Sequence, residues 1–235
     1  MRPAVRENAP AFALSLALAL ATKAAFSRLG PDELRWMTWP MQALVGVAAG
    51  LDFTYEAGYG YVDLAHRLVI AKSCTGVNYL LAVFGLLVFT RVPRAAGHAR
   101  KMAAVAGMAA AAYTVTIVVN ATRIAVGLAV HEAGWEAGWL TPARVHRLAG
   151  IAVYLTSLLA VHAAASRVES GAPGGAGWLA PLVAYAAVTV AIPLANGALL
   201  AHPSAFAEHS AWVALAVLVA GAMACVRRRA AMRGA

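Results

Sequence analysis

The chain has 235 residues, of which 62% are hydrophobic and 12% are charged, and its mean hydropathy is +0.70. A soluble domain usually has about 25% charged and about 45–50% apolar residues. This composition therefore excludes an ordinary soluble globule, a disordered chain and a disulfide-rich secreted scaffold. The apolar residues form long blocks without charges, which is typical of a helical protein that crosses a membrane several times.

The formal net charge is +9, from 19 Lys and Arg against 10 Asp and Glu. The basic residues lie largely in short segments between the apolar blocks, so membrane topology explains them better than nucleic acid does. The two cysteines, Cys74 and Cys225, are too few for a disulfide framework and form no CxxC motif. We therefore expect the lipid bilayer to surround the chain and expect no nucleic-acid partner.

Six apolar blocks approach the roughly 20 residues that a transmembrane helix needs. We predict an all-α integral membrane protein with one membrane-embedded domain, residues 1–235, and about six spans. The first block contains Lys23 and has no clear small-x-small cleavage site, so we expect it to be retained as a span. The predicted spans are Ala9–Phe26, Gly76–Thr90, Met102–Val119, Leu148–Ala165, Gly177–Leu200 and Ala211–Val226.

Basic residues mark alternate loops between these spans. The positive-inside rule assigns such segments to the cytoplasmic side. It predicts an inner-membrane protein with both termini in the cytoplasm. The basic residues concerned are Arg2, Arg6, Arg91, Arg94, Arg100, Lys101, Arg167, Arg227, Arg228, Arg229 and Arg233.

Residues Trp36–Leu51 are apolar enough for a seventh span, but a seventh crossing would break the alternation of basic segments. The segment is short, contains Pro40 and carries Trp39 near its start, and aromatic residues favour the membrane interface. We predict a helix that lies on the outer surface or dips into the membrane without crossing, with a true span as the alternative.

The next segment, Asp52–Ser73, has aromatic and β-branched residues, partial alternation and the turn glycines Gly58 and Gly60. This pattern predicts a short extracytoplasmic β-hairpin. Residues Asn120–Arg147 form a second predicted outer segment, rich in Gly, Trp and charged residues.

The first candidate motif is KSCTGVN, Lys72–Asn78, where the predicted hairpin meets a span. A helix N-terminus favours the thiolate of a cysteine such as Cys74, and free backbone N–H groups there can hold an oxyanion. Thr75 and Gly76 let a substrate approach the backbone closely. The alternative is that Cys74 is a small buried thiol, the usual fate of a free cysteine.

Two further motifs lie at the predicted outer ends of spans. NATR, Asn120–Arg123, closes one span with a guanidinium that can bind a carboxylate or an oxyanion, or can simply snorkel to the interface. RVHRLAG, Arg144–Gly150, opens the next span with His146, which suits proton transfer near neutral pH. The alternative is an interfacial histidine that only bounds the helix.

Together the three motifs offer a nucleophile, a base and a charge stabiliser, the parts of covalent acyl transfer. A competing class is a small transporter or scaffold that uses Arg123 and His146 for anion or proton handling, although no internal repeat is visible. A further alternative is a membrane phosphatase that uses His and Arg without cysteine, but the sequence lacks the second basic motif that such an enzyme requires. The sequence lacks HExxH, GxSxG, Walker A and GxGxxG motifs, so we expect no metal and no organic cofactor.

The motifs resemble those of one known family. SCTGVN, Ser73–Asn78, resembles the SCSGxN-type motif of the exosortase/archaeosortase family; NATRI, Asn120–Ile124, resembles its arginine motif; and His146–Tyr154 resembles its histidine motif. Their order and rough spacing agree with the family over about Trp36 to Val168, and the exosortase K subgroup is the most similar. Thr75 stands where the family commonly has serine, which keeps a hydroxyl.

Members of that family are membrane-embedded cysteine peptidases or transpeptidases. They act at the outer face of the cytoplasmic membrane on C-terminal sorting signals. Each signal consists of a short motif, a hydrophobic helix and a basic tail, so the implied partners are membrane-anchored substrate proteins. The resemblance implies Cys74 as nucleophile, His146 as general base or acid, and Arg123 as stabiliser of the oxyanion or thiolate. The residues expected to support them are Asn120, Asn78, Thr75 and Gly76.

Overall fold

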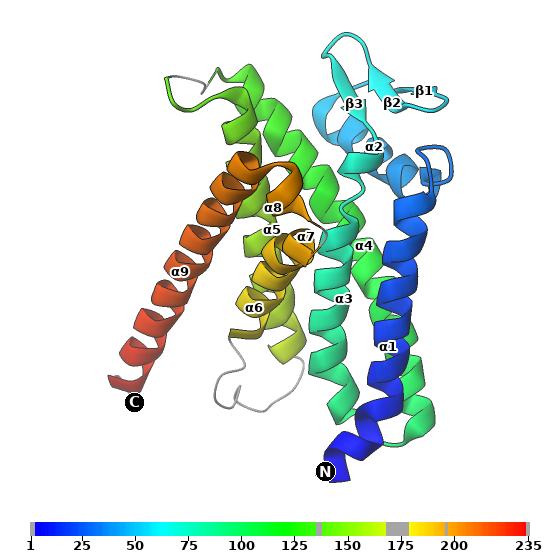
Figure 1. The fold of residues 1–235 in the computed structure, drawn as a ribbon, viewed down its shortest axis with the longest axis vertical. Coiled ribbons are helices and arrows are strands. Elements are labelled where there is room, and N and C mark those ends of the chain that lie inside the picture. Colours follow the sequence, from blue (N-terminus) through cyan, green and yellow to red (C-terminus); the bar gives the residue numbers. More distant parts are fainter. Residues whose placement is uncertain (1–2, 135–137, 168–178, 196, 234–235) are drawn as a thin grey trace. The chain divides into compact units, whose positions relative to one another are not determined.

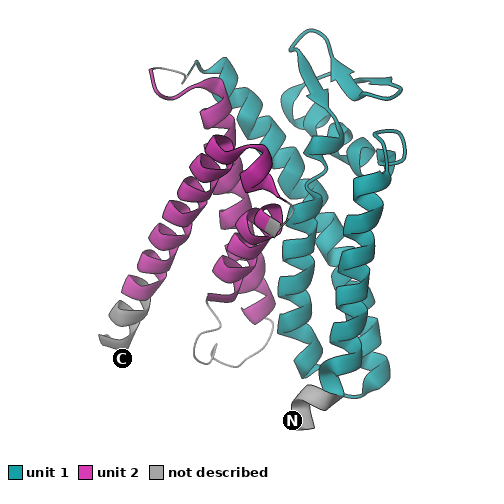
Figure 2. Ribbon diagram, in the orientation of Figure 1, with its two compact units in different colours: residues 1–136 teal, residues 137–235 magenta. Residues whose placement is uncertain are grey.

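The computed structural model describes residues 3–134, 138–167, 179–195 and 197–233 (Figure 1). The chain divides into two compact units, residues 1–136 and residues 137–235 (Figure 2). Cys74 and Arg123 belong to the first unit and His146 belongs to the second.

The first unit is a helical bundle with a small sheet. Figure 1 shows α2 and the sheet at the end of this bundle that lies away from the N-terminus. Its elements are α1 (Pro3–Arg28), α2 (Arg35–Ala49), β1 (Thr54–Glu56), β2 (Gly60–Asp63), β3 (Leu68–Ile70), the 3₁₀ turn η1 (Lys72–Cys74), α3 (Val77–Arg91), the 3₁₀ turn η2 (Val92–Arg94) and α4 (His98–Glu132).

The second unit is helical in the residues that the structure describes. Its elements are α5 (Pro142–Arg167), α6 (Ala180–Ala186), the π-helical segment η4 (Ala187–Ala191), α7 (Ile192–Ala195), α8 (Ala198–Ala201) and α9 (Pro203–Arg233).

Five helical segments are long and apolar enough to cross a membrane, so the chain is a multi-pass membrane protein. They contain five of the six predicted blocks. The block predicted as Gly76–Thr90 lies in a longer segment, which also includes the 3₁₀ turns η1 and η2 on either side of α3. The five segments are Glu7–Arg28, Lys72–Arg94, His98–Glu132, Pro142–Ser166 and Pro203–Val226.

The remaining block, predicted as the span Gly177–Leu200, is not a continuous helix. Its apolar helical part, Ala180–Leu194, is shorter than 18 residues, and it contains the π-helical segment. Pro193 lacks a backbone N–H, which favours such an irregular turn. The chain then bends at Gly197, whose φ of 80° is left-handed. The start of this block, residues 177–178, lies outside the described residues.

Helix α2 overlaps the segment Trp36–Leu51, for which a non-crossing helix was predicted, and begins one residue earlier, at Arg35. Its 15 residues extend about 22 Å, against a hydrocarbon thickness of about 30 Å. Met37, Met41 and Val45 recur every four residues and are buried, whereas Trp36 and Trp39 are exposed. The helix therefore has one face packed against the protein and is too short to cross a membrane upright.

The predicted hairpin is a three-stranded antiparallel sheet of order β1-β2-β3, so the prediction of two strands was wrong. Tyr61 pairs with Tyr55 on one side and with Ile70 on the other. The turn between β2 and β3 was not predicted because it contains no glycine. Arg67 takes the left-handed conformation there, with φ of 52°, and the Asp63 carboxylate accepts the His66 N–H at 2.9 Å.

The core of the first unit lies between α2, the sheet, α3 and α4. Buried side chains from all four form one cluster, which includes Met41, Tyr61, Val77 and Ile117. Cys74 packs against this cluster from its edge. The thiol therefore lies at the edge of a buried core cluster rather than inside it.

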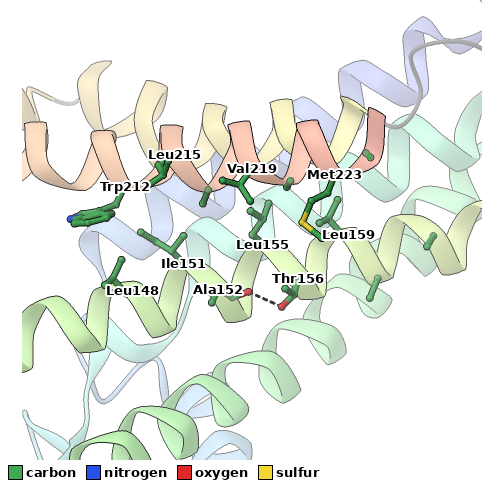
Figure 3. A pocket seen from close by; sticks show the side chains of 15 residues that line it. Leu148, Ile151, Ala152, Leu155, Thr156, Leu159, Trp212, Leu215, Val219 and Met223 are labelled. Atoms are coloured by element: carbon green, nitrogen blue, oxygen red, sulfur yellow. Dashed lines mark hydrogen bonds between the residues drawn. The ribbon is translucent and has the colours of Figure 1, made fainter. Parts of the chain in front are cut away.

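The second unit contains an apolar groove of about 760 Å³ between α5 and α9 (Figure 3). It runs from Leu148 and Trp212 at one end to Ala163 and Met223 toward the other. Almost every lining side chain is aliphatic, and the Thr156 hydroxyl donates to the Ala152 carbonyl within its own helix. The groove lining contains no titratable side chain among the residues that the structure describes, so it offers no acid, base or nucleophile of that kind.

Candidate active site

Cys74 ends the 3₁₀ turn η1 and lies three residues before α3, so it precedes the helix rather than beginning it. The Thr75 hydroxyl and N–H both donate to the Lys72 carbonyl, at 2.9 and 3.2 Å. Gly76 then takes a left-handed φ of 67° and starts α3, with its carbonyl accepting the Leu80 N–H at 2.9 Å. We call residues 72–76 the elbow.

Asn120 of α4 lies against this elbow. Its side-chain amide is fully buried and donates to the Thr75 carbonyl at 3.4 Å and to the Thr116 carbonyl at 2.9 Å. A Cβ on Gly76 would overlap that amide, with its Cγ only 2.7 Å away. Residue 76 therefore has to be glycine for two reasons: the left-handed backbone and the close approach of Asn120.

Arg123 lies on the same face of α4 as Asn120, one turn closer to the end of the helix. Helix α4 continues past NATR to Glu132, so this motif does not end the helix. Because its 35 residues exceed the roughly 20 that a span needs, the end of the span at NATR stays a prediction. Arg123 is half-buried, and its neighbours Ala121 and Ile124 belong to the cluster against which Cys74 packs. The structure thus brings the cysteine motif and the arginine motif together.

The Cys74 thiol itself is half-buried. Its Sγ lies 3.8 Å from the Val69 carbonyl oxygen of β3, at the long limit of an S–H···O contact. The elbow thus holds the sulfur beside the last strand of the sheet, accessible from outside the core. This position fits a reactive thiol better than the alternative of a fully buried one.

Two lysines were given no role by the sequence, namely Lys23 near the elbow and Lys72, which is the first residue of the elbow and of the KSCTGVN motif. Lys23 of α1 donates to the Asn78 side-chain oxygen at 2.6 Å, and Lys72 donates to the Leu29 carbonyl at 2.5 Å. Both ammonium groups also lie near the Phe26 ring, at 5.9 and 4.9 Å from its centroid. A lysine inside an apolar span is costly unless it has a partner, and that cost was the signal that could have found Lys23.

His146 is exposed in the first turns of α5, in the second unit. The convergence of His146 with Cys74 therefore stays a prediction. Arg144 and Arg147, on either side of it, contact the Glu208 carboxylate of α9 at 2.7 and 3.3 Å. The sequence analysis missed Glu208, although an acidic residue beside an apolar block could have suggested a partner for these arginines.

Two carboxylates outside the spans fix the sheet. The His66 N–H, which donates to Asp63, holds the pKa of that carboxyl below its usual range. The Gly58 N–H donates to Asp32 at 2.9 Å and the Tyr55 hydroxyl also donates to it, and these bonds lower the pKa of Asp32. The loop before α2 is thereby tied to the β1–β2 turn.

Among the described residues, no three His, Cys, Asp or Glu side chains are arranged to hold a metal ion. No protein-family model matches the chain, and no curated protein or solved structure is significantly similar to it. The residues themselves must therefore carry the functional argument.

Proposed function

We propose that the chain is a membrane cysteine peptidase or transpeptidase, related to the exosortase/archaeosortase family. It would cleave C-terminal sorting signals of exported, membrane-anchored proteins at the outer face of the cytoplasmic membrane. The observation that carries the proposal is the contact of Asn120 with the Thr75–Gly76 backbone. Two motifs 45 residues apart meet there, beside a half-buried thiol.

In the proposed reaction the Cys74 thiolate attacks the carbonyl carbon of the scissile peptide bond. Arg123 stabilises the negative charge on the oxygen as the Sγ–C bond forms. The C–N bond then breaks, and His146 gives a proton to the leaving amine. Water or an acceptor amine attacks the resulting thioester, and Cys74 leaves as thiolate.

The orientation in the membrane follows from charge. The turn between α3 and α4 lies at the end of the first unit opposite the sheet (Figure 1). It contains Arg94 in η2 and leads into the first turn of α4, which carries Arg100. The positive-inside rule assigns such a loop to the cytoplasm. The elbow and the sheet then face the outer side. Both termini lie in the cytoplasm in this proposal, which requires the interrupted segment of residues 180–201 to cross the membrane as a sixth span.

The direct test uses a membrane-anchored reporter that carries a C-terminal hydrophobic helix and basic tail, expressed with the full chain. Cys74→Ala should abolish processing of the reporter while the protein still inserts, and Arg123→Gln and His146→Gln should each slow it at least 100-fold. Cys225→Ala is the matched control and should process normally. Processing that survives Cys74→Ala contradicts the nucleophile assignment.

One observation favours the competing class, a transporter that uses Arg123 and His146. The helix of residues 180–201 is interrupted by a π-helical segment and by the bend at Gly197. Interrupted helices form ion and substrate sites in transporters. Proton or anion flux into liposomes that contain the purified chain, lost in Arg123→Gln but kept in Cys74→Ala, would support that class.

A further inference from the structure

Strand β3 has a partner on one side only. It pairs with β2, and no strand lies on its other side in the part of the chain that the structure describes. An open strand edge presents backbone donors and acceptors that can pair with another extended chain. The Cys74 thiol lies at this strand, 3.8 Å from the Val69 carbonyl oxygen.

The direction of the backbone groups in β3 can be worked out from Gly60. A Cβ on Gly60 of β2 would overlap the Ile70 carbonyl oxygen, so that carbonyl points toward β2. Successive carbonyl groups in a strand point to opposite edges. The Val69 carbonyl therefore points to the open edge, and its N–H points the same way, because both groups of one residue face one side in an antiparallel ladder.

We propose that this open edge binds an extended peptide segment as a fourth strand, beside Cys74. The Val69 N–H and carbonyl would bond to one residue of the segment. Neighbouring strands lie about 4.8 Å apart, so the backbone of the segment would pass close to the sulfur. This inference rests on the proposed peptidase function and assigns how the substrate segment next to the scissile bond is held.

Charge and exposure at the edge define the segment further. Arg67 is exposed directly before β3 and has no carboxylate partner among the described ion pairs. The Val69 side chain is 44% exposed. The occupant is therefore an extended peptide with an acidic side chain near Arg67 and an apolar one near Val69.

The test compares two thiol-reactive reagents on the full chain with Cys225→Ala, in detergent micelles. One is the peptide acetyl-Val-Glu-Val-Ala vinyl sulfone, and the other is methyl vinyl sulfone. Each rate of Cys74 alkylation is divided by the rate of the same reagent with glutathione. This normalised rate should be about tenfold higher for the peptide than for the small reagent, which is the effect of two backbone hydrogen bonds. We call this ratio the peptide gain.

Val69→Pro should remove most of that gain, because proline deletes the outward N–H and is tolerated at a strand edge. Val69→Ala keeps the N–H but shortens the side chain that faces the apolar residue of the peptide, so it should lower the gain less than Val69→Pro does. A peptide that is N-methylated at its central amide should lose its rate advantage with the Val69 protein. This test does not depend on the folding of any Val69 variant. Replacing Glu by Lys in the peptide should lower the rate severalfold, and Arg67→Glu should reverse that preference.

A peptide gain that survives both Val69→Pro and N-methylation overturns the edge-binding proposal, as does the absence of any gain. The small reagent tests the proposed function separately. If methyl vinyl sulfone alkylates Cys74 rapidly but the peptide reagent has no rate advantage, the assignment of Cys74 as nucleophile stands and only the edge-binding proposal is rejected. A peptide gain on an otherwise sluggish thiol supports the edge and counts against the peptidase.

Discussion

The spans that contain α3 and α9 have similar hydropathy, yet 56% of the apolar 18-residue stretch in the first is buried inside the protein, against 6% in the second. Nine of the 15 residues of α3 are buried, although Phe89 is exposed, and the elbow that carries Cys74 leads directly into this helix. Helix α9 borders the apolar groove and exposes Leu218 and Val219. The comparison shows that hydropathy alone does not distinguish a helix that supports a site from one that faces lipid.

The largest expected effect is at the start of α3. Gly76→Ala should cost about 2–4 kcal/mol, since it adds left-handed backbone strain and an overlap with Asn120. The measurement is thermal unfolding of the purified chain in micelles. Gly85→Ala is the matched control: no atom lies within 4 Å of its new Cβ, so it should be neutral or stabilising. Equal effects of the two changes would contradict the elbow packing.

The contrast in burial predicts a difference between two valines. Val83 of α3 is fully buried and Val219 of α9 is 50% exposed. Val83→Ala should destabilise by about 1 kcal/mol, because it removes packing contacts that lipid cannot replace, and Val219→Ala should have almost no effect. The same unfolding assay checks both variants. A cost at Val219 that matches the cost at Val83 would show that α9 is packed against protein in the membrane.

A smaller effect is expected where α5 meets α9. Glu208→Gln removes one partner from Arg144 and Arg147, but between 26% and 37% of each of the three side chains is exposed, so we expect at most about 1 kcal/mol. Glu7→Gln is the control, because Glu7 is 75% exposed and should contribute less. The comparison is sharpest at low salt. An effect of Glu208→Gln that grows with added salt would rule out an ionic origin.

The smallest effect is local and depends on pH. The pKa of Asp32 is lower in the folded protein than its ordinary value of 3.8, so its ionised form stabilises the fold. That contribution is complete above the ordinary value and is lost as pH falls through the lowered pKa. Hydrogen exchange at the Gly58 amide, corrected for its intrinsic pH dependence, should therefore quicken below about pH 3.8. Asp32→Asn should remove this pH dependence.

The sequence was sufficient to predict the membrane class and five of the spans, because charge-free apolar blocks require little tertiary information. It was not sufficient for residues 180–201, where an equally apolar block contains Pro193 and a π-helical segment. It also underestimated α4, because a helix that continues past the polar residues Asn120 and Arg123 has no hydropathy signal.

The site was partly predictable in the same way. Cys74, Asn120 and Arg123 stand out by residue type, and the structure brings their segments together. The third strand was missed because Arg67 occupies a turn position where glycine or asparagine is usual. Lys23 was missed as a site residue because its partner, Asn78, is 55 residues away, and such a contact exists only after packing.

The bond between Lys23 and Asn78 has a consequence for how the chain assembles. Only 11% of the first span is buried, so α1 can enter the bilayer as a separate helix. Until α3 follows, the Lys23 ammonium has to reach toward the headgroups, because hydrocarbon offers it no acceptor. Once α3 is inserted, the Asn78 side-chain oxygen accepts a hydrogen bond from the Lys23 ammonium. The bond between α1 and α3 at Lys23 can therefore form only after the helix that follows Cys74 has been inserted.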